Sequence, residues 1–162
     1  MRIPVAAFAL AVALGGTAYA QQASIPNFLS TDDVRAAIAR AEREIKPGQP
    51  TFSTPLIAAN GYTARLEYRQ SVGPAAIHES DGELFYVLSG GGTFVIGGAL
   101  LKGEPRPGGN LSGTGIAGGE SRHIGTGDFF VVPAGTPHFF SAIDGKLVLI
   151  SLHLPAAAAP KP

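Results

Sequence analysis

Two histidines and one glutamate attract attention because imidazole and carboxylate groups together bind divalent cations. His78 and Glu83 lie in the stretch IHESDGELFYVLSGG, residues 77–91, and His138 lies in GDFFVVPAGTPHFF, residues 127–140. Glu83 opens an apolar run that belongs in a protein interior, where an ionised carboxylate is costly unless a positive partner meets it. A buried glutamate near histidines therefore indicates either a metal site or a buried ion pair.

A turn must lie between His78 and Glu83 if the two side chains are to meet. Side chains alternate faces along a strand, so residues five positions apart on one straight strand point in opposite directions. The Ser80-Asp81-Gly82 triplet between them is a turn signal that lets the chain reverse. We expect three such groups from three strands, His138 being the third, to meet inside a barrel and hold one divalent ion.

One helix is expected ahead of the strands. Ser30 and Asp33 form a capping-box pattern, and alanine-rich sequence follows until Pro47-Gly48 ends it, which predicts a helix over residues 31–45. Its apolar face should pack on the outside of the main body. The residues predicted to form that face are Val34, Ile38 and Ile45.

Strand signals dominate the rest of the chain. Asn60-Gly61 lies between two β-prone runs and predicts a hairpin. The second arm, residues 62–69, alternates apolar and polar side chains, as a half-buried antiparallel strand does. Many short strands separated by Gly, Pro and Asp turns predict a sandwich or barrel. Further strands are predicted at residues 84–88, 93–96, 129–132, 138–143 and 147–154.

Glycine-rich stretches interrupt this pattern. Residues 101–120 are rich in Gly and Pro and are interpreted either as a mobile loop over one end of the barrel or as a disordered loop. The runs at 90–92 and 118–119 have no helix after them, so they indicate strand turns rather than phosphate-binding loops. Asn110-Leu111-Ser112 matches a glycosylation sequon, but such triplets are common by chance.

Composition limits the classes of function. The 162 residues suit one domain, and twelve basic and twelve acidic side chains cancel, with no clustered basic face for nucleic acid. The chain has no cysteine, so any metal must be held by histidine and carboxylate rather than by thiolate. No G-x-S-x-G sequence occurs that would indicate a nucleophile elbow.

The N-terminus has the layout of a secretory signal. A lone Arg2 precedes an apolar stretch, and small residues end at Ala18-Tyr19-Ala20, which predicts cleavage before Gln21 and export to the periplasm or the medium. The apolar run is too short to span a bilayer comfortably. The predicted organisation is a signal peptide at 1–20, an N-terminal extension with the helix at 21–50, a β-barrel at 51–155 and an Ala/Pro tail at 156–162.

The two histidine-containing stretches resemble the motifs of the cupin superfamily. In the first, GPAAIHESDGELFYVLSG, six residues separate Glu83 from Gly90; in the second, the pattern from Gly127 through Pro133 ends at His138. The resemblance covers residues 60–154 and implies an all-β fold, a small jelly-roll barrel with its site inside the mouth. It also implies one bound divalent ion, Fe, Mn or Zn, and dioxygenase or isomerase/lyase chemistry on a small molecule.

The sequence departs from the family pattern at one ligand. The family commonly has a His-x-His pair ahead of the glutamate; His78 matches its second histidine, and Ala76 stands where the first would be. His78, Glu83 and His138 remain as the expected ligands, and such a set suits non-haem Fe(II), zinc or manganese. The alternative is a metal-free module that binds a small ligand, with Glu83 and His78 as an ion pair. Aromatic lining of the barrel mouth would come from Phe85, Phe129 or Phe139.

Other polar residues rank lower as ligands. Glu79 is expected to be exposed because neighbours on a strand point apart. His123 is expected to be an exposed strand-end residue, with a fourth ligand or a proton carrier as the alternatives. His153 is expected on a polar strand face with Ser151. Both faces of the strands at 84–88 and 129–132 are apolar, so one face must be covered by another part of the protein. Either the N-terminal hairpin or a second copy of the chain could cover it, and a homodimer is the more economical prediction.

Overall fold

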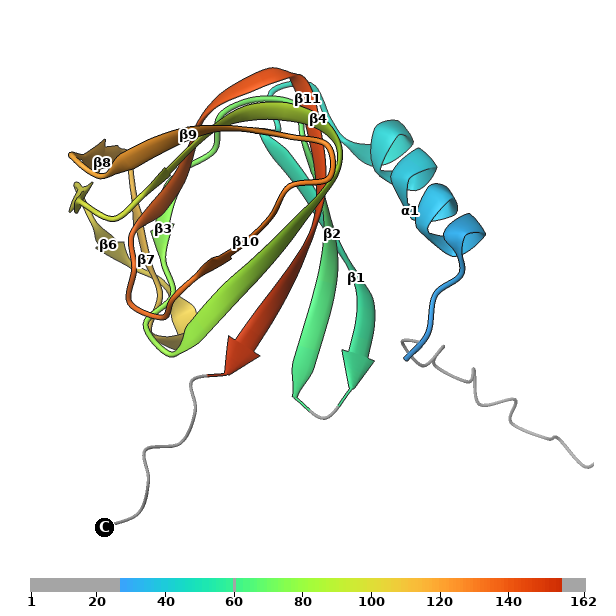
Figure 1. The fold of residues 1–162 in the computed structure, drawn as a ribbon, viewed down its shortest axis with the longest axis horizontal. Coiled ribbons are helices and arrows are strands. Elements are labelled where there is room, and N and C mark those ends of the chain that lie inside the picture. Colours follow the sequence, from blue (N-terminus) through green and yellow to red (C-terminus); the bar gives the residue numbers. More distant parts are fainter. Residues whose placement is uncertain (1–26, 60, 156–162) are drawn as a thin grey trace, which may run out of the picture.

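The computed structural model describes residues 27–59 and 61–155. Within these residues a single helix, α1 (Thr31–Glu44), lies against the outside of a body built from eleven strands (Figure 1). The predicted signal peptide and the Ala/Pro tail lie outside the described residues. The strands are β1 (Thr51–Ala59), β2 (Tyr62–Arg69), β3 (Ala75–Ile77), β4 (Asp81–Ile96), β5 (Ala99–Leu101), β6 (Glu104–Pro105), β7 (Leu111–Gly113), β8 (Gly115–Ala117), β9 (Glu120–Gly125), β10 (Phe129–Val132) and β11 (His138–Pro155).

The two longest strands, β4 and β11, organise the barrel. They pair antiparallel from His138 opposite Ile96 to Pro155 opposite Asp81. Strands β10 and β2 extend one half of this ribbon, and β9 and β3 extend the other half. Within the described residues nine strands form one continuous sheet, and β5 pairs with β8 in a separate one. The ribbon folds over so that its two halves face each other, as in the predicted jelly-roll (Figure 1).

Strand β4 bends at its glycines instead of ending there. The sequence predicted separate strands at 84–88 and 93–96, and the structure shows one strand running through both. Gly90 has φ +82°, and a Cβ on it would lie 2.0 Å from the carbonyl oxygen of Lys146. Only glycine permits that conformation and that approach at little cost.

Strand β11 likewise replaces two predicted strands, at 138–143 and 147–154. Its pairing with β4 shifts register between Phe140 and Ala142, and again between Ile143 and Leu147. Such β-bulges bend a strand and increase its twist without breaking it. The bend returns both ends of β11 to the same side of the molecule.

Helix α1 closes the outer face of β1, β2 and β11. Its predicted capping box is present, because Ser30 Oγ accepts from the Asp33 amide at 3.2 Å and Asp33 accepts from the Ser30 amide at 2.8 Å. Ala41 is fully buried, and Ile38 packs on the strands as predicted, whereas Val34 and Ile45 are half-buried outside that cluster. The buried strand residues beneath the helix are Leu56, Leu66 and Val148.

The interior of the barrel has its own apolar core. Phe85 lies at its centre, with ring centroids of Phe94, Phe130 and Phe140 between 5.2 and 6.0 Å away. These rings fill the middle of the barrel and leave its ends to other side chains. The other buried members are Val87, Ile124, Val132, Leu147 and Leu149.

Two predicted connections have different outcomes. The hairpin at 60–61 is confirmed, because Ala59 lies opposite Tyr62 and Gly61 has φ +85°. The segment 101–120 is not a long loop, since it contains β6, β7, β8 and a short 3₁₀ helix, Pro107–Gly109. Its strand β7 pairs with β3, which anchors the segment beside the barrel mouth. No helix in the described part of the chain is long and apolar enough to cross a membrane.

Candidate metal centre

Glu83 is a buried carboxylate at one end of the barrel. Alternation along β4 puts Glu83 on the inward face that also carries Phe85 and Val87. The residue is 3 % exposed, so its charge requires partners inside the protein. Three histidines provide them.

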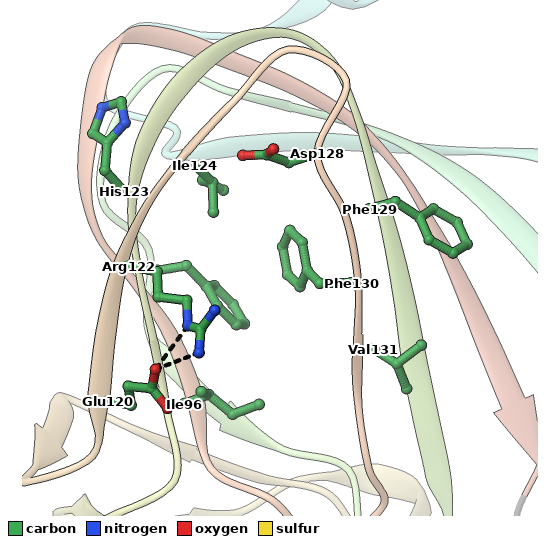
Figure 2. A pocket seen from close by; sticks show the side chains of 10 residues that line it. Ile96, Glu120, Arg122, His123, Ile124, Asp128, Phe129, Phe130 and Val131 are labelled. Carbon is green, nitrogen blue, oxygen red and sulfur yellow. Dashed lines mark hydrogen bonds and ion pairs between the residues drawn. The ribbon is translucent and has the colours of Figure 1, made fainter.

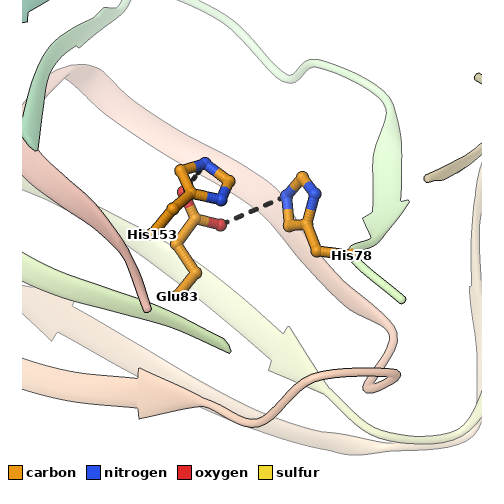
Figure 3. A group of neighbouring side chains, drawn as sticks. All are labelled: His78, Glu83 and His153. Atoms are coloured by element: carbon orange, nitrogen blue, oxygen red, sulfur yellow. Dashed lines mark ion pairs between the residues drawn. The ribbon is translucent and has the colours of Figure 1, made fainter. Parts of the chain in front are cut away.

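Each of these histidines approaches a carboxylate oxygen with its Nε2 atom. The Nε2 atoms of His78 and His138 both lie 3.4 Å from Oε2 of Glu83, and Nε2 of His153 lies 3.5 Å from Oε1. Figure 3 shows the rings of His78 and His153 beside the carboxylate of Glu83, and the two ring centroids are 4.9 Å apart. The structure therefore brings the three residues singled out in the sequence around one group, and it adds His153.

The bent ribbon explains how residues so distant in sequence meet. His78 follows β3, while His138 and His153 come from opposite ends of β11. His153 is directly opposite Glu83 in the β11–β4 register, and His138 is opposite Ala76 on β3. Ala76 lines the same cavity, so a histidine there would have reached the centre. His153 approaches the carboxylate next to His78, so three imidazoles surround it.

Hydrogen bonds fix which nitrogen of His78 and of His138 faces the glutamate. The Nδ1–H of His138 donates to the carbonyl oxygen of Thr136 at 3.1 Å, and the Nδ1–H of His78 donates to Oδ1 of Asn110 at 3.1 Å. The amide of Asn110 is oriented in turn by donating to the Pro107 carbonyl at 3.2 Å. In the neutral rings Nε2 then carries the lone pair, as a metal ligand requires.

The charges of the centre are strongly coupled. Burial raises the pKa of the Glu83 carboxyl, but its interactions with His138 and His78, and the charges of His138 and His153, outweigh burial and hold that pKa well below its usual value. The interaction with Glu83 raises the pKa of His78 against the opposing effect of burial. The carboxylate is therefore ionised and attracts positive charge, whether protons or a cation supply it.

The donor set fits a divalent cation. In a tetrahedral site with ligand distances of about 2.1 Å, the donor atoms are about 3.4 Å apart, close to the separations between Glu83 and each histidine. One donor atom from each of His78, Glu83 and His153 can be chosen so that all lie within 4.8 Å of one another. His138 contacts Glu83 but does not belong to that group of three.

The remaining candidates lie elsewhere. Glu79 is exposed, as expected. His123 is 70 % exposed and contacts Asp144 at 2.8 Å, which agrees with the exposed strand-end interpretation and excludes it from the centre. The expectation for His153 was incomplete: it does share a face with Ser151, but that face points into the barrel, where Ser151 is fully buried.

A cavity of about 330 Å³ opens beside the candidate metal centre. His78, Glu83, His138 and His153 line one part of it, and polar residues of β1 and β2 line the rest. Of the three predicted aromatic residues, Phe139 lines this cavity, Phe85 lies in the core beneath it, and Phe129 lines a different cavity.

A second cavity of about 450 Å³ lies between β9 and β10 (Figure 2). Phe94, Ile124 and Phe130 form its apolar floor, and Phe130 points into the opening whereas Phe129 points away. An ion pair between Glu120 and Arg122 lies at its rim. This cavity contains none of the metal-centre residues.

Fold and site together identify the class of protein. The chain belongs to the cupin family, whose model matches residues 53–157. No curated protein matches the sequence.

Solved structures with a similar fold share little sequence with this chain. A protein from Bacillus halodurans is 16 % identical with a TM-score of 0.53, covering 82 % of this chain and 84 % of its own. The DMSP lyase DddQ from Ruegeria pomeroyi is 18 % identical with a TM-score of 0.50, covering 85 % and 70 %. Streptomyces Pac13, solved as a variant with uridine, is 15 % identical with a TM-score of 0.47, covering 68 % and 73 %. At these identities the likeness shows the fold alone.

Proposed function

We propose that this protein is an exported metalloenzyme that binds one divalent cation at Glu83 and acts on a small organic molecule. The observation that carries the proposal is the approach of three Nε2 atoms to one buried carboxylate. His78, Glu83 and His138 are the ligands expected from the sequence, and His153 is the fourth ligand that we add. Bound Fe, Mn or Zn would supply a Lewis acid or, for a redox-active ion, an oxygen activator.

The residues around the ligands have positioning roles. Asn110 and the Thr136 carbonyl accept from the two Nδ1–H groups and hold the rings with Nε2 toward the carboxylate. The aromatic core beneath the centre, with Phe85 6.3 Å from the His138 ring, limits water on that side. The cavity on the other side is where a small substrate would bind.

The metal content of the purified mature protein tests this proposal. Protein reconstituted separately with Fe(II), Mn(II) and Zn(II) should retain one equivalent of at least one ion after desalting. His138→Ala and His153→Ala should each weaken retention, and His123→Ala is the matched control because His123 is exposed and outside the cavity. Retention of no stoichiometric ion would overturn the proposal, and unchanged retention by His153→Ala would return the ligand set to His78, Glu83 and His138.

The reaction class is tested on the loaded protein. The family implies either dioxygenase or isomerase/lyase chemistry, and the two differ in their need for oxygen. Turnover of a small-molecule panel that proceeds unchanged without oxygen supports an isomerase or lyase. Consumption of one oxygen per product supports a dioxygenase.

A metal-free ligand-binding module is the second candidate function. It is favoured by the ion pair itself, because His78, whose pKa Glu83 raises, can balance the charge of the carboxylate without a cation. In that case chelator treatment would leave the melting temperature unchanged. A melting temperature that falls with chelator and recovers with added metal would exclude this candidate.

We also propose export and a homodimer. The signal pattern supports export, with cleavage before Gln21, and the N-terminal sequence of the mature protein tests it. The dimer is supported by the exposed outer face of β4 and β10, where Phe129 lies opposite Tyr86 with ring centroids 6.4 Å apart and Val131 continues the apolar surface. Light scattering should give twice the chain mass for wild type and the single-chain mass for Phe129→Asp; a single-chain wild type would contradict it.

A further inference from the structure

The metal cavity contains two arginines that differ in how their charges are balanced. Strand β2 presents Arg65, Glu67 and Arg69 on the face that lines this cavity, while Leu66 lies on the opposite face under helix α1. A guanidinium beside a metal centre provides planar, charged donors for a carboxylate or phosphate group. The question is which arginine is available to a substrate.

Arg69 already has a carboxylate partner in the protein. Its Nε and Nη2 both donate to Oε2 of Glu67, at 2.9 and 2.5 Å, and its guanidinium lies 4.2 Å from the centroid of the Phe140 ring. The other oxygen of Glu67 accepts from the Ser151 hydroxyl at 3.0 Å. This network cancels its own charge and holds Arg69 in place.

Arg65 has no such carboxylate partner. Its Nε donates to Oγ of Ser53 at 2.8 Å, and no acidic group of the described residues lies within 4.0 Å of its guanidinium nitrogens. The serine fixes the side chain near the cavity while both terminal nitrogens are left for other acceptors. Arg65 therefore contributes an unbalanced positive charge to the cavity.

The strand register places Arg65 within a small molecule's length of the centre. Arg65 is opposite Ser151 on β11, and Ser151 is opposite Phe85 on β4, two residues along from Glu83. Two strand spacings are about 10 Å and two residues along a strand are about 7 Å, and the two long side chains shorten that gap. A molecule of a few carbon atoms can contact both the metal centre and Arg65.

The charge balance selects the kind of molecule. With a divalent cation bound, Glu83 cancels half of its charge, Glu67 and Arg69 cancel each other, and Arg65 adds one further positive charge. We propose that the substrate of this site is a small organic oxyanion, a carboxylate or phosphate, whose anionic group binds the guanidinium of Arg65 while another part reaches the metal. This inference rests on the proposed function.

Paired probes on the metal-loaded protein test the inference. Calorimetry should show that malate binds at least tenfold tighter than its neutral diamide, malamide, and that Arg65→Met removes most of this preference. Arg65→Lys should restore part of it, since the charge returns without the two-pronged geometry. Arg122→Met is the matched control, because Arg122 is an exposed arginine at the other cavity, and it should keep the full preference.

The outcomes separate this inference from the proposed function. Glycerol 3-phosphate, compared with glycerol, distinguishes a phosphate from a carboxylate as the bound group. Full metal content with equal affinity for malate and malamide, or a preference unchanged in Arg65→Met, would overturn the inference alone. Failure of wild type to take up metal would overturn the proposed function instead. Unaltered melting of Arg65→Met verifies that the variant is folded.

Discussion

The two cavities of this barrel are built on opposite principles. At the candidate metal centre the two carboxylates are inside the protein, where Glu83 is 3 % and Glu67 8 % exposed, and each has a specific charged or histidine partner. At the cavity between β9 and β10 the interior is aromatic, and the charged pair lies at the rim, with side chains of Glu120 and Arg122 62 % and 70 % exposed. Buried charges are costly unless they are satisfied. The concentration of buried charges at one end of the barrel is therefore the better indicator of a chemical site. Cavity size would instead favour the cavity between β9 and β10.

The largest contrast between the cavities should come from their glutamates. Glu83→Gln removes the anion on which three imidazoles converge, so metal affinity should fall by more than about 100-fold, since loss of a ligand's supporting partner alone costs about 10–100-fold. Glu120→Gln should retain full metal affinity. Competition with a fluorescent chelator measures both. Equal metal affinity in the two variants would contradict the assignment of the centre.

A smaller effect is expected at Asn110, which contacts a ligand rather than the ion. Asn110→Ala removes the acceptor of the His78 Nδ1–H, so the ring loses its fixed orientation. Metal affinity should fall by about 10–100-fold with little change in the melting temperature of the metal-free protein. Thr114→Ala in the same segment is the control, because Thr114 is exposed and does not contact His78. An Asn110→Ala variant with wild-type affinity would show that the hydrogen bond is incidental.

Above about pH 6.5 the stability of the metal-free protein should fall with rising pH, whereas its metal affinity should rise. Because the folded pKa of His78 is raised, its contribution to the stability of the metal-free protein is fully present below about pH 6.5 and is lost as pH rises through the raised value. The contribution of Glu83, whose pKa is lowered, is present above about pH 4.3 and is lost as pH falls through its folded value. Metal affinity should instead rise with pH, because the cation requires the neutral imidazole.

Urea unfolding in the presence of chelator, from pH 5 to 9, measures the first trend, and metal titration over the same range measures the second. His78→Gln should remove the decline in stability on the alkaline side. A difference in unfolding free energy between wild type and His78→Gln that stays constant over this range would contradict the coupling between His78 and Glu83.

The smallest effect is expected at the rim of the aromatic cavity. Arg122→Ala breaks an exposed ion pair with Glu120, and such pairs contribute about 0.5 kcal/mol or less. Thermal unfolding should therefore be nearly unchanged. A loss of several kcal/mol would show that the second cavity also depends on its charges.

The sequence alone was sufficient to predict those features that depend on a local pattern of residues. The cupin-like spacing ending at His138, the capping box at Ser30 and the hairpin at 60–61 are each local patterns, and the family and those two elements are confirmed. Which face of a strand lies inside is a tertiary property. Alternation in β2 was visible, but the face with Arg65 and Glu67 lines a cavity and the apolar face lies under α1.

Sequence analysis missed the roles of His153 and Asn110 for the same physical reason, which is that both depend on tertiary structure. His153 reaches the centre only because bulges and glycines bend β4 and β11, and a bend of that kind was predicted as a break between strands. Asn110 was noted in the sequence only as part of a glycosylation sequon. In the structure its amide oxygen accepts a hydrogen bond from His78, because the pairing of β7 with β3 brings the two residues together. Asn110 lies in a stretch rich in glycine and proline, and that composition predicted a loop rather than the ordered strands that the structure shows.

That both ends of β11 supply imidazoles has a consequence for how the protein matures. His138 and His153 lie near opposite ends of β11, so both reach Glu83 when this strand, the last of the described residues, has paired with β4 at both ends. If the chain is exported as proposed, an unfolded chain in transit would not yet hold a cation between these groups. The identity of the ion would then be decided by what is abundant where the chain finishes folding, rather than where it is translated.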